Sequence, residues 1–212
     1  MDQHKYGVSD ISLPNGLPNS VVQTYVLLTC SIIVFFLGTF VPTNMVMSWV
    51  SIGLSFIFLF LTIAKEKSIF MLGYSFCIGL MNNLFLENIG QINPYVIQEA
   101  LAVTIIIFIG LTILSYHVPY GFFLIAGLLY SLVITLLCVI VINIFVQNTF
   151  LEIISIYLGI VTFSGFIIID TRKLIFVTNH TPVQHTLALF LDFINLFIQL
   201  TKYMVLFRKK EK

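Results

Sequence analysis

Charged residues are scarce in this chain, at 9% of 212 residues, whereas 59% are hydrophobic and the mean hydropathy is +1.06. A soluble domain carries about 25% charged residues, so this composition excludes a water-soluble globular domain as the body of the protein. The formal net charge is only +1. Because no basic patch stands out, nucleic-acid binding has no support.

Cysteine is also rare. Cys30, Cys77 and Cys138 are the three cysteines, and each falls inside an apolar run without metal-ligand spacing. The pattern therefore argues against a disulfide or zinc framework. We expect all three to be buried packing residues, and we expect no cofactor.

Long apolar runs dominate the remainder. A bilayer core of about 30 Å needs roughly 20 helical residues, and runs of that order occur at 21–41, 45–64, 68–88, 96–116, 120–146, 149–177 and 185–207. They predict an all-α polytopic membrane bundle of about seven helices. We expect a short cytoplasmic tail at 1–20, a transmembrane domain at 21–207 and a basic tail at 208–212.

Gly73 and Gly79 suit close helix packing, and the asparagines Asn82, Asn83, Asn143 and Asn195 are expected to form hydrogen bonds between helices.

The positions of Lys and Arg predict the orientation, because cytoplasmic loops are enriched in them. With a cytoplasmic N-terminus, Lys5, Lys65, Lys67, Arg172 and Lys173 all fall on the cytoplasmic side. The basic tail is the exception. Either the rule fails there, or the last segment folds back as a hairpin instead of crossing fully.

Acidic residues inside membrane segments are costly and mark functional sites by default. Glu87, Glu99 and Glu152 map near the non-cytoplasmic ends of their segments, where the loops contain no Lys or Arg. This face should attract cations, so the three glutamates are candidates for an ion path. The alternative for Glu99 and Glu152 is that an acid at a segment end simply reaches the headgroups.

Asp170 and Asp192 form the sharpest constellation. The midpoint between them is Thr181, in the turn between the last two segments, so an antiparallel hairpin places both carboxyl groups at similar depth. Two carboxylates this close cannot both ionise readily, and the pair titrates as a coupled unit. The pair is therefore a candidate pH sensor, gate and calcium ligand.

A structural alternative is that each aspartate pairs with a nearby base. On a helix Lys173 can reach Asp170, whereas Arg172 faces away from it. Lys202 lies about 15 Å along the axis from Asp192. An ion pair with a nearby basic residue therefore accounts for one of the two aspartates at most.

Two stretches carry a family resemblance. Gly165-Phe166-Ile167-Ile168-Ile169-Asp170-Thr171 and Leu189-Phe190-Leu191-Asp192-Phe193-Ile194-Asn195-Leu196-Phe197 resemble the signature of the Bax inhibitor motif membrane proteins. Tyr25-Val26-Leu27-Leu28-Thr29 and Glu87 with Asn93-Pro94 are similar to other parts of that family. The resemblance spans nearly the whole chain, although segments two, four and five match mainly in hydropathy.

This resemblance implies seven helices with the last at the centre and a pH-sensitive calcium leak. Asp170 and Asp192 match the family's pH-sensing pair. It also implies suppression of cell death, contact with cell-death regulatory membrane proteins and, in a eukaryote, the endoplasmic reticulum membrane. Some members carry another acid one turn before the last aspartate, where this chain has Ala188, which implies a less negative pathway.

Other function classes remain open at this stage. A non-conducting adaptor for cell-death or stress-response proteins would need the aspartates only for structure. An intramembrane protease could use paired aspartates to activate water, but no further protease motif is present, and we expect no enzyme. A retinal receptor would use Lys202 for a Schiff base, and Trp49 is the only tryptophan to line its pocket.

Overall fold

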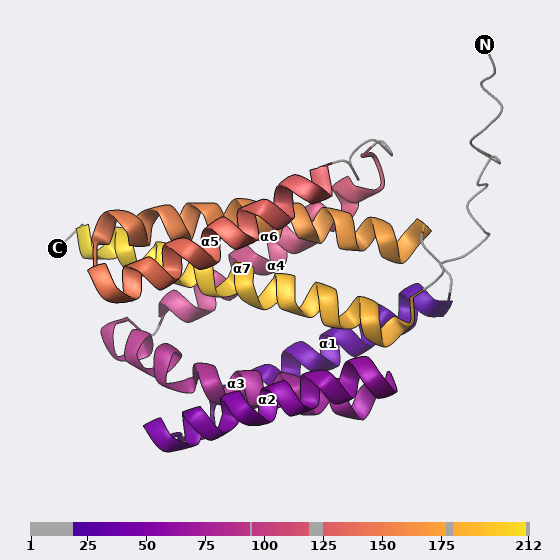
Figure 1. The fold of residues 1–212 in the computed structure, drawn as a ribbon, viewed down its shortest axis with the longest axis horizontal. Helices are drawn as coiled ribbons and strands as arrows, with labels where there is room; N and C mark the ends of the chain where they lie inside the picture. Colours follow the sequence, from indigo (N-terminus) through magenta and orange to yellow (C-terminus); the bar gives the residue numbers. More distant parts are fainter. Residues whose placement is uncertain (1–18, 94, 119–124, 177–179, 211–212) are drawn as a thin grey trace, which may run out of the picture.

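The computed structural model describes residues 19–93, 95–118, 125–176 and 180–210. Seven long helices occur in these ranges, all long and apolar enough to cross a membrane (Figure 1). Their bounds are α1 (Asn19–Thr39), α2 (Met45–Lys65), α3 (Ser68–Ile92), α4 (Tyr95–Ser115), α5 (Ala126–Val146), α6 (Thr149–Phe176) and α7 (Pro182–Lys210). The predicted all-helical polytopic membrane bundle is confirmed.

The last helix decides between the two alternatives left open by the basic tail. α7 is one continuous helix of 29 residues, or about 44 Å at 1.5 Å per residue, so it is long enough to cross fully and is not a hairpin. It continues through Arg208 to Lys210, beyond the predicted end of the segment at 207. Residues 1–18 and 211–212 of the two predicted tails lie outside the described residues, as do 119–124 at the start of the fifth predicted segment.

Short connections set the order of the helices, and local capping interactions mark several helix ends. The Asn44 side chain accepts a hydrogen bond from the Met47 N–H (2.8 Å) and caps the start of α2. Glu66 (φ 51°) and Gln147 (φ 50°) are in the left-handed conformation just after α2 and α5, which closes a helical last turn. Thr181 caps α7 by accepting from the Gln184 N–H (3.4 Å), with Pro182 as first helical residue.

α7 lies at the centre of the bundle. It packs against α6, α1 and α4, with smaller contacts to α3 and α2. In Figure 1 it runs between α5 and α6 on one side and α1, α2 and α3 on the other. In its most apolar stretch 56% of residues are buried, against 11% for α5. Residues on α7 are therefore the ones that face other helices most often.

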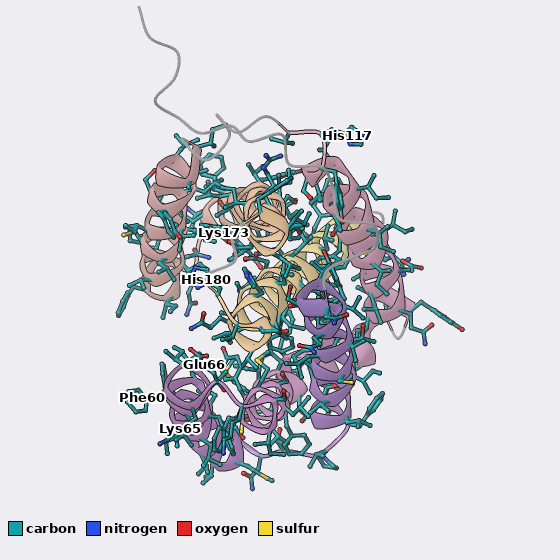
Figure 2. All side chains as sticks on the ribbon, turned by 90° about the vertical axis from the view of Figure 1, so that its right-hand side faces the viewer. Phe60, Lys65, Glu66, His117, Lys173 and His180 are labelled. Atoms are coloured by element: carbon teal, nitrogen blue, oxygen red, sulfur yellow. The ribbon has the colours of Figure 1, made fainter. Side chains whose placement is uncertain are left out.

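The outside of the bundle is apolar. Large hydrophobic side chains such as Trp49, Phe60 and Phe145 are mostly exposed, and Phe60 projects away from the helices in Figure 2. Such a continuous apolar surface is suited to lipid, since soluble monomers rarely show one. Cys30 and Cys138 lie on this surface and only Cys77 is buried, so the prediction of three buried cysteines was wrong for two of them. Hydropathy does not distinguish a residue that faces lipid from one that faces the core.

The α1 and α3 backbones touch at a pair of glycines. A Cβ atom on Gly79 would lie 2.1 Å from the Phe35 carbonyl oxygen, and one on Gly38 would lie 2.6 Å from that of Phe76. Side chains are excluded at both positions, which confirms the predicted close packing at Gly79. Next to this crossing, Phe35 packs edge-on against Phe190 and Phe197 of α7.

Candidate functional site: an acid pair between α6 and α7

The two predicted aspartates come together in the structure. Asp170 lies six residues before the end of α6 at Phe176, and Asp192 lies ten residues after the start of α7 at Pro182. The carboxyl groups are neighbours that interact with one another. Both residues are buried, with 9% of Asp170 and 6% of Asp192 exposed.

The two carboxyl groups have different partners. Lys173 donates from Nζ to Asp170 Oδ1 at 2.7 Å, one turn along α6. Asp192 Oδ2 is buried and has no hydrogen-bond partner among the residues that the structure describes. As the sequence indicated, a nearby basic residue pairs with one aspartate, Asp170, and Asp192 keeps a buried oxygen that is not hydrogen-bonded to any described residue.

Arg172 does not take part in this pair. Its guanidinium donates to the Ser115 carbonyl oxygen at 2.9 Å and to the Val118 carbonyl oxygen, and it lies 5.0 Å from the centre of the Phe176 ring. A cation is favourable at a helix C-terminus, where carbonyl groups lack helical partners. Arg172 therefore secures the end of α4 against α6, as expected from its position on the opposite face from Asp170.

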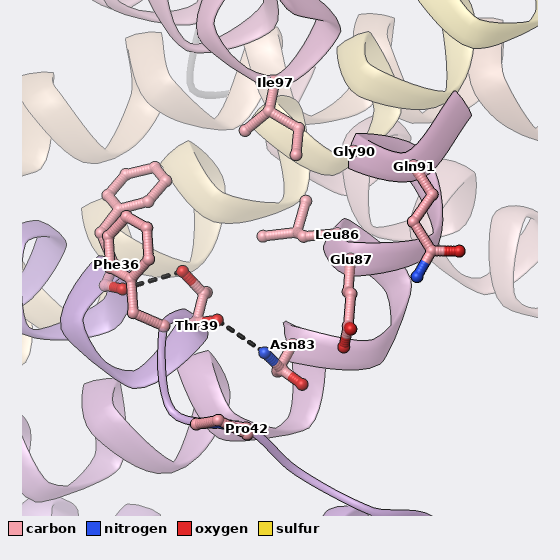
Figure 3. A pocket seen from close by; sticks show the side chains of 10 residues that line it. Phe36, Thr39, Pro42, Asn83, Leu86, Glu87, Gly90, Gln91 and Ile97 are labelled. Carbon is pink, nitrogen blue, oxygen red and sulfur yellow. Dashed lines mark hydrogen bonds between the residues drawn. The ribbon is translucent and has the colours of Figure 1, made fainter. Parts of the chain in front are cut away.

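Glu87 lines a pocket at the other end of the bundle. The pocket has a volume of about 560 Å³ and is bounded by α1, α3, α4 and the turn after α1, with Thr39, Asn83 and Gln91 among its polar residues. Figure 3 shows Glu87 directed into it from α3. The pocket lies at the end of the bundle that the predicted orientation places on the non-cytoplasmic side.

Asn83 holds one wall of this pocket in place. Its amide donates to the Thr39 carbonyl oxygen at 2.7 Å (Figure 3). The same amide accepts from the Thr43 hydroxyl at 2.7 Å, so it joins α3 to the end of α1 and the residues that follow. This is the interhelical role predicted for the asparagines. Asn82 and Asn195 instead bond to carbonyl oxygens within their own helices, and Asn143 accepts from Asn148 in the turn after α5. The face of the helix on which each asparagine lies determines whether its side chain reaches a neighbouring helix.

The other two glutamates have basic neighbours. Glu99 on α4 forms an ion pair with Arg208 at the end of α7, and both side chains are partly exposed. Glu152 on α6 shares a small pocket of about 180 Å³ with Asn143, Ser155 and Lys202. Lys202 also lies 5.9 Å from the Phe85 ring centre. Neither glutamate lies at the acid pair, and the sequence reasoning did not anticipate the partners from α7, which are distant along the chain.

The site offers few ligands to a metal ion. Among the residues that the structure describes, no group of three or more His, Cys, Asp or Glu side chains gathers closely enough to hold one. Asp170 and Asp192 together supply at most two carboxylate groups. Ca²⁺ prefers six to eight oxygen ligands, so the two aspartates alone fall short of a complete calcium site.

The fold and the site define a class: a polytopic membrane helix bundle with a buried pair of carboxyl groups beside its central helix. Residues 17–209 match the family described as inhibitor of apoptosis-promoting Bax1, and the chain belongs to this Bax inhibitor family. The resemblance noted in the sequence is thereby confirmed.

The individual relatives share between 25% and 29% of their residues with this chain over the matched regions. An uncharacterised protein of Campylobacter jejuni is 25% identical over 196 residues, which is 85% of each chain. Bax inhibitor 1 of Drosophila melanogaster is 29% identical over 143 residues, covering 66% of this chain and 58% of the fly protein. Human Bax inhibitor 1 is 28% identical over 144 residues, covering 66% of this chain and 61% of the human protein. The matches thus span about three fifths of these two eukaryotic relatives.

Proposed function

We propose that the protein is a pH-sensitive calcium leak channel that suppresses cell death, with Asp170 and Asp192 as the proton sensor and gate. The observation that carries this proposal is the position of two buried carboxyl groups on neighbouring helices, one with an oxygen that no described residue hydrogen-bonds. A buried polar oxygen without a hydrogen bond is costly. Its retention is explained if a cation or a proton binds there during function.

Protonation provides the gate. When both carboxyl groups are ionised, they attract a divalent cation with hard oxygen ligands. When the pair holds a proton, one carboxyl group can donate to the other, and the charge that attracts the cation is reduced. Calcium is thus the transported ion and no cofactor or catalytic step is involved.

The three glutamates are assigned to the path on the opposite side of the membrane. Glu87 is the strongest of these candidates, because it lines an open pocket, mostly apolar, whose described lining residues include no basic side chain. Glu99 and Glu152 are next to Arg208 and Lys202, which weaken the attraction for a cation. They contribute to the path only where these basic groups move aside.

The cell-death role rests on the family's description and on the names of the eukaryotic relatives. In a eukaryotic cell the proposed location is the endoplasmic reticulum membrane. A calcium leak there lowers the stored calcium, and cell-death regulatory membrane proteins are the proposed partners.

Calcium flux from liposomes tests the proposal. Purified protein is reconstituted with a calcium dye, and flux is measured in mildly acidic, neutral and mildly alkaline buffer. We expect wild-type flux to rise as protons leave the pair. The double variant Asp170→Asn, Asp192→Asn should lose this pH response and most of the flux, because its amides carry no charge.

A matched control removes the same two charges elsewhere, as Asp2→Asn with Asp10→Asn, and should leave both flux and pH response unchanged. Wild-type protein that is folded in the liposomes but conducts no calcium at any pH would contradict the channel. If the same protein still suppressed cell death, the adaptor function would take its place.

A further inference from the structure

We propose that Lys173 is a built-in cation of the acid pair that competes with calcium for Asp170 and so sets how strongly the site binds an external cation. This inference rests on the proposed function and concerns the regulation of the same site. It starts from the ion pair between Lys173 and Asp170, at 2.7 Å between Nζ and Oδ1.

The negative charges near Lys173 come from two helices. Asp170 lies on its own helix and Asp192 on α7, and each carboxylate attracts the ammonium group. Figure 2 views the end of the bundle where α6 finishes, and Lys173 lies within the outline of the helices there, whereas Phe60 and His117 project from it. The ammonium group is therefore part of the site.

The charge balance explains why this matters for calcium. With both carboxyl groups ionised, the pair carries two negative charges and Lys173 returns one positive charge. A calcium ion that binds both carboxylates must approach this ammonium or displace it, and like charges repel strongly where little water screens them. Without the ammonium group of Lys173, the two carboxylates would therefore bind an external cation more tightly.

The Lys173 side chain is also able to move away from Asp170. Its side chain is 30% exposed while that of Asp170 is 12% exposed, and it lies three residues before the end of α6 at Phe176. A lysine in such a position can extend its flexible stem to the headgroup region. Arg172 cannot replace it at the pair, since its guanidinium is bonded to the end of α4.

The test compares Lys173→Met, which keeps the apolar stem and removes the charge, with Lys173→Arg, which keeps the charge. Calcium binding to purified protein is measured by titration calorimetry, and flux is measured in liposomes below saturating calcium. We expect Lys173→Met to bind calcium about tenfold more tightly and to conduct correspondingly more. Lys173→Arg should bind no more tightly than wild type. Lys65→Met, which removes an exposed lysine at the same end of the bundle, should have no effect.

The two proposals fail in different ways. If the double aspartate variant abolishes wild-type flux but Lys173→Met binds and conducts calcium as wild type does, the role of Lys173 is refuted and the channel stands. A Lys173→Met protein with an unchanged melting temperature and weaker calcium binding also refutes it. If no variant conducts, the channel fails, and tighter calcium binding by Lys173→Met would still support the competition.

Discussion

Replacing Gly79 with alanine is expected to destabilise the protein by about 3 kcal/mol, or to prevent folding, because the core is overpacked where two backbones meet. The new Cβ atom would lie 2.1 Å from the Phe35 carbonyl oxygen and 3.0 Å from the Gly38 Cα. Both are backbone atoms, so no side-chain rotation relieves the clash. α1 and α3 must move apart, and Phe35 then loses its contacts with Phe190 and Phe197 on the central helix.

The measurement is the fraction of monodisperse protein that survives heating in detergent, compared with Gly110→Ala as a control. A Cβ atom on Gly110 meets nothing within 4 Å, and alanine favours helix over glycine by roughly 1 kcal/mol. The control should therefore be neutral or slightly stabilising. Equal melting temperatures for the two variants would show that α1 and α3 do not approach as closely as the structure has them.

The spans and the acid pair could be predicted from the sequence because both depend on local properties. Run length identifies a membrane helix without knowledge of its neighbours, and an antiparallel hairpin of the last two segments brings Asp170 and Asp192 toward one another whatever surrounds them. The helical spacing of Asp170 and Lys173 likewise predicted that their side chains could meet, and they do. The sequence therefore contained most of the candidate site.

Helix rotation and distant pairing could not be predicted in the same way. A continuously apolar run contains no period that distinguishes a lipid-facing from a buried side, which is why Cys30 and Cys138 were placed wrongly. The rotation of α3 decides that Asn83 reaches the end of α1 while Asn82 bonds within its helix. Glu99 meets Arg208 across 109 residues, a contact that only the packing of α4 on α7 creates.

The two aspartates should respond in opposite directions when each is changed to asparagine alone. Asp192→Asn is expected to stabilise the protein by about 1–2 kcal/mol in neutral or alkaline buffer, because it replaces a buried carboxyl group that has an unsatisfied oxygen and lies beside another acid. The new amide can also donate to Asp170. Asp170→Asn removes the partner of Lys173 and should destabilise by about 1 kcal/mol, a modest loss because that lysine is partly exposed to solvent.

A double-mutant cycle isolates the cause of this asymmetry. Combining Asp170→Asn with Lys173→Met should recover most of the stability lost in the single aspartate variant, since the ammonium group that lost its partner is then removed as well. The stabilisation by Asp192→Asn should be smaller in acidic buffer. The wild-type pair then holds a proton, so the two carboxyl groups repel each other less and a neutral side chain removes less repulsion. Melting temperatures in acidic and alkaline buffer measure both effects. Equal changes for the two single variants would mean that the two carboxyl groups share one environment, contrary to their different partners in the structure.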